Sequence, residues 1–190
     1  MAVVIDGTNG ISTPDLESAG QVLAFGVATS LYPLVSGTAV ASTSGTSINF
    51  NSIPSWAKRI TVMFSGVSTS GSSAVQVQLG TSGGVQATGY NAASAIGAGA
   101  NTFSMSVITT GFGEASGAAA VVRHGSAILS LLDSSTGLWS MIYNIGTTDT
   151  QRVFLIYGTK SLSGVLDRVR ITTVNGTDTF DAGSINIMWE

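Results

Sequence analysis

The sequence predicts an all-β protein, an antiparallel β-sandwich resembling a jelly roll, with a short N-terminal arm. Hydrophobic and polar residues alternate with a period of two through most of the chain beyond residue 36, which is typical of half-buried strands. Turn residues separate almost all of these stretches, and the long crossovers that a parallel sheet needs are missing. Short strands joined by turns favour antiparallel sheets over an α/β fold.

Residues 1–36 differ from the rest of the chain and are expected to form an attachment arm, with residues 37–190 forming the β domain. A turn is expected over Asp6–Gly10, because Asn-Gly adopts a positive φ at little cost. Thr13 could cap a helix with Pro14 in its first turn, and an extended segment is the alternative. The pattern changes at Ser36 and Gly37, which offer a joint between the two parts.

Nine stretches of the β domain are expected to form strands, because each shows the alternation or a short apolar run. In residues 75–79, for example, two glutamines alternate with Val75, Val77 and Leu79. The apolar run 128–132 is nearly continuous and is expected to form a central strand of a sheet. The expected strands are 48–50, 60–64, 75–79, 103–107, 128–132, 138–142, 153–157, 169–171 and 185–189, with turns at Ser70-Gly71, Gly83-Gly84, Asp133–Gly137 and Asn175-Gly176.

Two Gly- and Ala-rich stretches, residues 80–100 and 111–120, are expected to be long loops. Long loops on a sandwich commonly carry binding residues. The first stretch contains one aromatic residue, Tyr90, whose ring is poorly explained by core packing. We therefore predict that a glycan, if one is bound, lies in the loops around Tyr90, Arg123 and His124, since an aromatic ring can stack on a sugar without any charge.

The low charge content excludes several classes of protein. The chain carries 7 Lys and Arg and 10 Asp and Glu in 190 residues, or 9%, against roughly a quarter in an average soluble domain. So few charges solvate a lone surface poorly, and we expect a stable homo-oligomer. The only adjacent cations are Lys58 and Arg59, so no basic stripe indicates nucleic-acid binding.

Neither secretion nor membrane insertion is expected. The first six residues lack the basic region of a signal peptide, which disfavours a secreted lectin. The apolar stretch 22–35 is interrupted by Gly26 and Pro33 and is too short to span a bilayer, so we interpret it as a buried or interface segment. The chain has no cysteine, which excludes disulfides and thiolate ligands.

No catalytic constellation is recognisable, so the protein is expected not to be an enzyme and to need no cofactor. His124 is the single histidine, and no Gly-x-Ser-x-Gly elbow surrounds a serine. A structural role for His124 is the simpler interpretation, and ligand binding is the alternative. Asp133 and Asp149 lie in expected loops and are the pair that a polysaccharide depolymerase would use.

Metal binding is not expected either. One histidine and no cysteine exclude an ordinary zinc site. Asp178 and Asp181 lack the alternating acidic spacing of a calcium loop, so we expect them to hold backbone amides of a turn. The three tryptophans are interpreted as closing the ends of the core, with sugar stacking as the alternative; they are Trp56, Trp139 and Trp189.

Three parts of the chain resemble bacteriophage tail-fibre and tail-appendage proteins. The opening Ile5-Asp-Gly-Thr-Asn-Gly-Ile-Ser-Thr-Pro14 is similar to the start of many such proteins. Residues 44–50 with 53–62, and the ending Leu166-Asp-Arg-Val-Arg through Ser-Ile-Asn-Ile187, resemble modules that recur in phage proteins. The resemblance carries no catalytic motif and transfers no functional residue.

This resemblance implies a virion structural protein, assembled in the cytoplasm of the host bacterium. Residues 1–36 would join it to other virion proteins, and the β domain would point outward as a trimer to recognise host-surface glycans. The alternatives are a purely architectural role, as a capsid decoration or tail adaptor, and a depolymerase tailspike. No coiled-coil heptad or chaperone-cleavage site is seen, which favours a short fibre, a fibre tip or a surface decoration.

Overall fold

The computed structural model describes residues 5–6, 10–11, 21–24, 27–30, 34–99 and 102–190, and the chain divides into two compact units. The described residues of the first unit, Met1–Leu34, form two antiparallel strand pairs. These are β1 (Ile5–Asp6) with β2 (Gly10–Ile11), and β3 (Gln21–Ala24) with β4 (Val27–Ser30). The helix considered after Thr13 lies outside the described residues.

The second unit, Val35–Glu190, is built from antiparallel sheets, and its described residues contain no helix. The all-β prediction is therefore confirmed. This unit begins two residues before the expected boundary at residue 37, because the short strand β5 (Val35–Ser36) pairs with the last strand of the chain. The role of the preceding segment as an attachment arm stays a prediction.

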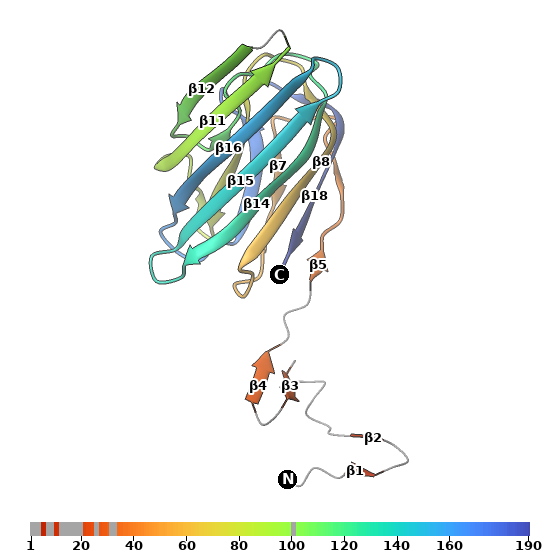
Figure 1. The fold of residues 1–190 in the computed structure, drawn as a ribbon, viewed down its shortest axis with the longest axis vertical. Coiled ribbons are helices and arrows are strands. Elements are labelled where there is room, and N and C mark those ends of the chain that lie inside the picture. The colour runs from red at the N-terminus through yellow and green to blue at the C-terminus, as the bar shows by residue number, and fades with distance from the viewer. Residues whose placement is uncertain (1–4, 7–9, 12–20, 25–26, 31–33, 100–101) are drawn as a thin grey trace. The chain divides into compact units, whose positions relative to one another are not determined.

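The larger sheet of this unit has nine strands and faces the reader in Figure 1. Its spatial order is β12 (Thr102–Ile108), β11 (Tyr90–Ala98), β16 (Arg152–Ser161), β15 (Leu138–Thr147), β14 (Arg123–Asp133), β8 (Arg59–Thr69), β18 (Phe180–Trp189) and β5, with β6 (Val40–Ala41) also paired to β18. The apolar run expected at 128–132 lies in β14, between β15 and β8, and its central position is confirmed.

The smaller sheet has five strands. They are ordered β10 (Gly84–Val85), β9 (Val75–Thr81), β17 (Arg168–Thr173) and β7 (Ser47–Phe50), and β13 (Phe112–Gly113) pairs with β9. All nine predicted strands are confirmed, because each expected stretch coincides with a strand of one of the two sheets.

Both sheets send apolar side chains into one hydrophobic core. From the larger sheet, the rings of Phe64 and Tyr143 stack with centroids 5.3 Å apart. From the smaller sheet, Val77, Leu79 and Ile171 are completely buried. Each such aliphatic side chain stabilises the fold by about 1.5–3 kcal/mol relative to an exposed one, so this shared core accounts for most of the driving force.

The prediction of one long loop over residues 80–100 is wrong, because it contains β11. This strand is made largely of Ala, Ser and Gly, which have low strand propensity, so its composition is typical of a loop. It pairs along its length with β12 on one side and β16 on the other, and these ladders override the local preference. Gly158 of β16 permits the close approach, since a Cβ there would lie 2.6 Å from the carbonyl oxygen of Asn91.

The second expected loop, residues 111–120, is only partly open. Phe112 is completely buried on β13, and Glu114 beside it is also buried. The aromatic ring belongs to the core, and Glu114 makes an ion pair inside it. Most of the surface that the sequence analysis assigned to binding loops is therefore part of the sheets and their core.

Candidate functional site

Tyr90 is a core residue and not a loop aromatic. It begins β11, and only 3% of its surface is exposed. Its hydroxyl oxygen accepts a hydrogen bond from the backbone N–H of Leu79 at 2.6 Å, and its ring meets Phe112 edge to face. Burial raises the pKa of Tyr90 to about 12. The predicted placement in a loop is wrong, and the buried ring offers no face to a sugar.

Arg123 is also buried, at the start of β14, so its predicted loop position is wrong too. Its Nε donates to Glu114 Oε1 at 2.7 Å, and its Nη1 donates to the carbonyl oxygen of Val121. The phenol of Tyr143, also buried in the core, interacts electrostatically with both members of the ion pair. Burial raises the pKa of Glu114, although the guanidinium of Arg123 opposes the shift. Both side chains of the pair are fully buried, so the pair is inaccessible to a ligand.

His124 follows Arg123 and is exposed, because successive side chains of a strand point to opposite faces. The register of β8 against β14 shifts at this point, so Gly66 is left out of the ladder, with a φ of 68° that suits glycine. His124 Nδ1 accepts a hydrogen bond from the Gly66 N–H at 3.3 Å. The structural interpretation of His124 therefore has a physical basis, and the three predicted residues do not form one exposed site.

The two candidate carboxylates of a depolymerase are far apart. Asp133 precedes β15 and Asp149 follows it, so a strand of 10 residues separates them, a distance of about 30 Å. Paired catalytic carboxylates lie within about 10 Å of each other. Asp133 accepts hydrogen bonds from Ser135 and Thr136, which lower its pKa, and Asp149 accepts one from the N–H of Val122.

The acidic turn near the C-terminus is held by its own side chains. Asp178 accepts hydrogen bonds from the backbone N–H of Ser73 at 2.8 Å and from Asn175 Nδ2 at 2.7 Å. Asp181 pairs with the hydroxyl of Ser68. Within the described residues, no three His, Cys, Asp or Glu side chains gather as a metal site would require. Asp178 therefore holds a backbone amide, as the sequence analysis expected, whereas Asp181 lies in β18 and its partner is a side-chain hydroxyl.

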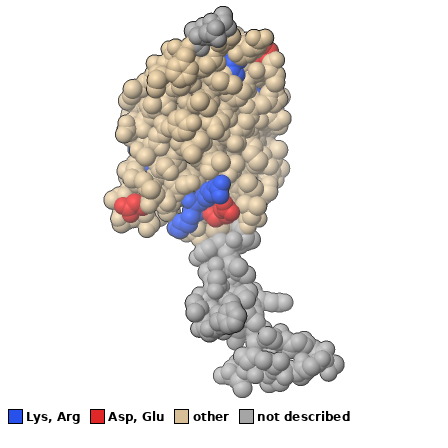
Figure 2. Space-filling model, in the orientation of Figure 1, with Lys and Arg blue, Asp and Glu red and all other residues tan. Residues whose placement is uncertain are grey.

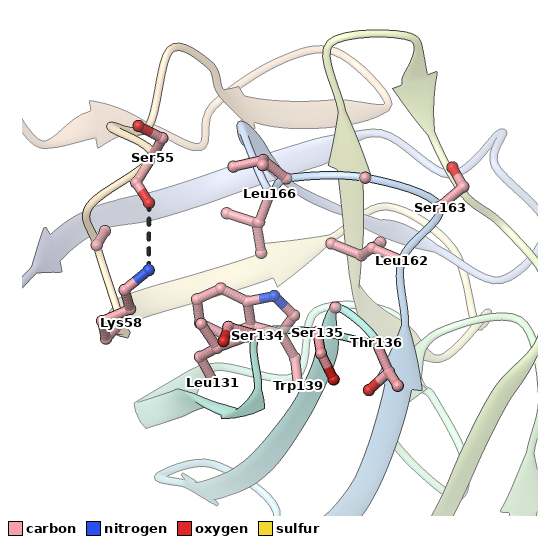
Figure 3. A pocket seen from close by; sticks show the side chains of 14 residues that line it. Ser55, Lys58, Leu131, Ser134, Ser135, Thr136, Trp139, Leu162, Ser163 and Leu166 are labelled. Carbon is pink, nitrogen blue, oxygen red and sulfur yellow. Dashed lines mark hydrogen bonds between the residues drawn. The ribbon is translucent and has the colours of Figure 1, made fainter.

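An open pocket of about 300 Å³ lies at one end of the larger sheet. Three loops surround it: residues 55–58 before β8, residues 134–137 between β14 and β15, and residues 162–166 between β16 and β17. Figure 3 shows Trp139 between these loops, with Leu131, Leu162 and Leu166 around its indole. Only 3% of Trp139 is exposed, so most of the ring closes the core, as the sequence analysis expected.

Hydroxyl side chains share the pocket lining with apolar ones, and three of the hydroxyls have defined hydrogen-bond roles. The hydroxyls of Ser135 and Thr136 donate to Asp133 at 2.7 and 2.8 Å, so their oxygens remain as acceptors. Ser163 Oγ accepts from Gln86 Nε2 at 2.6 Å, which leaves its own proton free to donate. Lys58 is the cation of the pocket lining, and its Nζ lies 3.5 Å from the carbonyl oxygen of Ser55 (Figure 3). This mixture suits a hydroxyl-rich ligand of little charge.

Sequence reasoning predicted no site here. It interpreted Trp139 as closing the core, with sugar stacking as the alternative, and it expected a turn at Asp133–Gly137, which together were the available signal. Residues 55–58 and 162–166 lie far away in the sequence and join the turn only through the order of strands. Trp56 and Trp189 are partly buried against the core, in agreement with the expectation that tryptophans close its ends.

No protein-family model, curated protein or solved structure matches this chain. In the described part of the chain, no helix is long and apolar enough to cross a membrane. The function must therefore be argued from the pocket, the surfaces and the composition of the protein itself.

Proposed function

We propose that this chain is a non-enzymatic structural protein of a bacteriophage virion, a tail fibre or appendage whose β domain recognises host-surface glycans. In this proposal the two sheets pack as a jelly-roll-like sandwich, residues 1–36 attach to other virion proteins, and the assembled form is a homotrimer. The observation that supports glycan binding is the pocket beside Trp139, because hydroxyl and apolar side chains together line it and three loops can vary around it. The phage assignment rests on the sequence resemblance.

A purely architectural role, as a capsid decoration or tail adaptor, is the second candidate. One observation favours it: Trp139 exposes only 3% of its surface, so little of the ring is available for stacking on a sugar. In this case the pocket would be a surface feature without a ligand. A depolymerase is the weaker alternative, since Asp133 and Asp149 lie at opposite ends of β15.

The two candidates are separated by blocking the pocket. Ser134 is exposed in the loop at the pocket, and Thr148 is exposed at the opposite end of β15. Ser134→Trp should abolish binding of the purified protein to host cells and to their isolated surface polysaccharide, because the indole would fill the pocket. Thr148→Trp is the matched control and should bind normally. Equal binding by both variants would eliminate the pocket, and a wild-type protein that binds no host polysaccharide would favour the architectural role.

A further inference from the structure

The outward side of the larger sheet carries large apolar side chains that are exposed and do not pack in the core. They come from three strands, β12, β15 and β16, and between 37% and 77% of each is exposed. We call this surface the apolar face; its large members are Phe103, Met105, Val107, Ile142, Val153, Leu155 and Tyr157.

The strand register makes the apolar face continuous. Val107 of β12 lies opposite Ala93 of β11, which lies opposite Tyr157 of β16, which lies opposite Ile142 of β15. The next outward rows repeat this arrangement: Met105, Ala95 and Leu155, then Phe103, Gly97 and Val153. A row of small residues on β11 therefore runs between two rows of large ones. This relief is self-complementary, because a large row of one copy fits against the small row of another.

The apolar face is free of charge. Successive side chains of a strand alternate between faces, and none of the outward residues of β11, β12, β15 and β16 is Asp, Glu, Lys or Arg. Figure 2 shows this side of the β domain as a broad uncharged area, with coloured atoms only near the ends of the strands. A charged partner would find no complementary group here, whereas an identical neutral surface meets no repulsion.

The size of the apolar face matches a stable interface. The exposed fractions of its seven large side chains together equal about four fully exposed ones, or roughly 800 Å² at about 200 Å² for each. The largest apolar patch of a typical monomer is about 300–600 Å². A standard interface buries about 800 Å² on each partner. The face therefore supplies, by itself, the area that one copy contributes to a specific contact.

The border of this face is an unprotected edge strand. β12 ends the strand order of the larger sheet in the described chain and pairs only with β11. Its sequence, Thr-Phe-Ser-Met-Ser-Val-Ile, has no lysine or proline to discourage further association. An uncovered edge beside an apolar face is a site of aggregation unless another chain or segment covers it.

We propose that the apolar face is the surface through which copies of this chain bind one another. The inference deepens the homo-oligomeric part of the proposed function and names its contact surface, on strands β11, β12, β15 and β16. It does not depend on the pocket, because the pocket is built from loops at the end of the sheet. Loss of glycan binding and loss of assembly can therefore be measured separately.

The test uses one substitution at two exposed valines. Val107 is 77% exposed on the apolar face, and Val174 is 47% exposed in the turn after β17. Light scattering of the full chain at micromolar concentration should give a multiple of 19.2 kDa for the wild type and for Val174→Glu. Val107→Glu should give a monomer with an unchanged circular dichroism spectrum. A monomeric wild type, or an intact oligomer for Val107→Glu, would overturn the proposal.

A second measurement applies even if Val107→Glu fails to fold. The chain has no cysteine, so Ala93→Cys places a unique thiol in the centre of the apolar face. Its reaction with a maleimide should be several-fold slower at high protein concentration than after dilution, because assembly covers it. Thr177→Cys, at an exposed turn, should react at one rate throughout. A rate for Ala93→Cys that does not depend on concentration would contradict self-association and would point to cover by residues 1–33 or to no cover at all.

Discussion

The two sheets differ on their outward faces, although side chains alternate between the faces of both. Polar side chains of the smaller sheet are hydrogen-bonded, whereas apolar side chains of the larger sheet are exposed. On the smaller sheet, polar side chains bond to one another: Arg170 Nε donates to Gln78 Oε1 at 2.9 Å, and Gln78 Nε2 donates to the carbonyl oxygen of Thr110 at 2.8 Å. On the larger sheet, the side chains of Val107 and Tyr157 point outward and stay exposed. The polar face is satisfied within one chain, whereas the apolar face gains stability only when something covers it.

This contrast teaches that alternation identifies strands without identifying the buried side. In β12, the apolar residues Phe103, Met105 and Val107 would be assigned to the core by their period of two, yet they are among the most exposed large hydrophobic residues of the described chain. In β9, by contrast, the apolar residues do face the core. Five predictions test the contrast between inward and outward residues, in order of decreasing effect on stability.

The largest effect is expected inside the larger sheet at Arg123. Arg123→Met would leave the Glu114 carboxylate buried without its partner, which should lower the free energy of unfolding by about 3–5 kcal/mol. The neighbouring outward residue is the control: His124→Asn can still accept from Gly66 and should cost less than about 0.5 kcal/mol. Urea denaturation measures both. The double variant Glu114→Leu with Arg123→Met should regain part of the loss, and no regain would contradict the role of the buried charge.

A smaller effect is expected at the buried tyrosine. Tyr90→Phe removes the acceptor of the Leu79 N–H, which should cost about 1–3 kcal/mol. Tyr157→Phe, on the apolar face, is the matched control and should leave the stability of the dissociated chain unchanged. Thermal unfolding of both variants at a concentration below assembly compares them. Equal losses would mean that the phenol of Tyr90 makes no net contribution.

Tyr90 also predicts the direction of the pH dependence. Burial raises its pKa from 10.0 to about 12, so the folded state keeps the phenol protonated when the unfolded chain ionises. The resulting stabilisation is complete below about pH 10 and is lost as the pH rises toward 12. Denaturation curves between pH 9 and 12 should fall less steeply for Tyr90→Phe than for the wild type. Parallel curves would contradict the shifted pKa.

A modest effect is expected on the outer face of the smaller sheet. Arg170→Met removes two hydrogen bonds to Gln78 from a partly buried site and should cost about 1 kcal/mol. It should leave the oligomer mass unchanged, because the polar side chains of this face bond within one chain and are not expected to contact another copy. A monomer produced by Arg170→Met would move the interface to the smaller sheet.

The smallest effect on the folded chain, but a large one on assembly, is expected for Val107. Val107 is 77% exposed, so Val107→Ser on the apolar face should change the free energy of unfolding of the dissociated chain by less than about 0.5 kcal/mol. Sedimentation over a concentration series should show weaker association, since apolar area is removed from the contact. A clear loss of stability in the dissociated chain would mean that Val107 packs against the rest of its own chain.

The candidate site was less predictable than the strands, for a physical reason. The sequence marked Trp139 and the turn before it, but the pocket also needs residues 55–58 and 162–166. These loops meet at one end of the sheet only because β8, β14, β15 and β16 are neighbours in the order shown in Figure 1. Strand order depends on long-range pairing, which no local pattern encodes.

The sequence by itself determined the all-β class, the nine recognisable strands and the scarcity of charge, because alternation, turn residues and composition are local properties of the chain. Only the tertiary structure decided which side of each strand is buried and how the strands are ordered. Tyr90 shows why: its segment is rich in Ala and Gly, yet pairing with β12 and β16 makes it a strand and puts its ring in the core. The pairing register, which depends on contacts between distant residues, sets the faces.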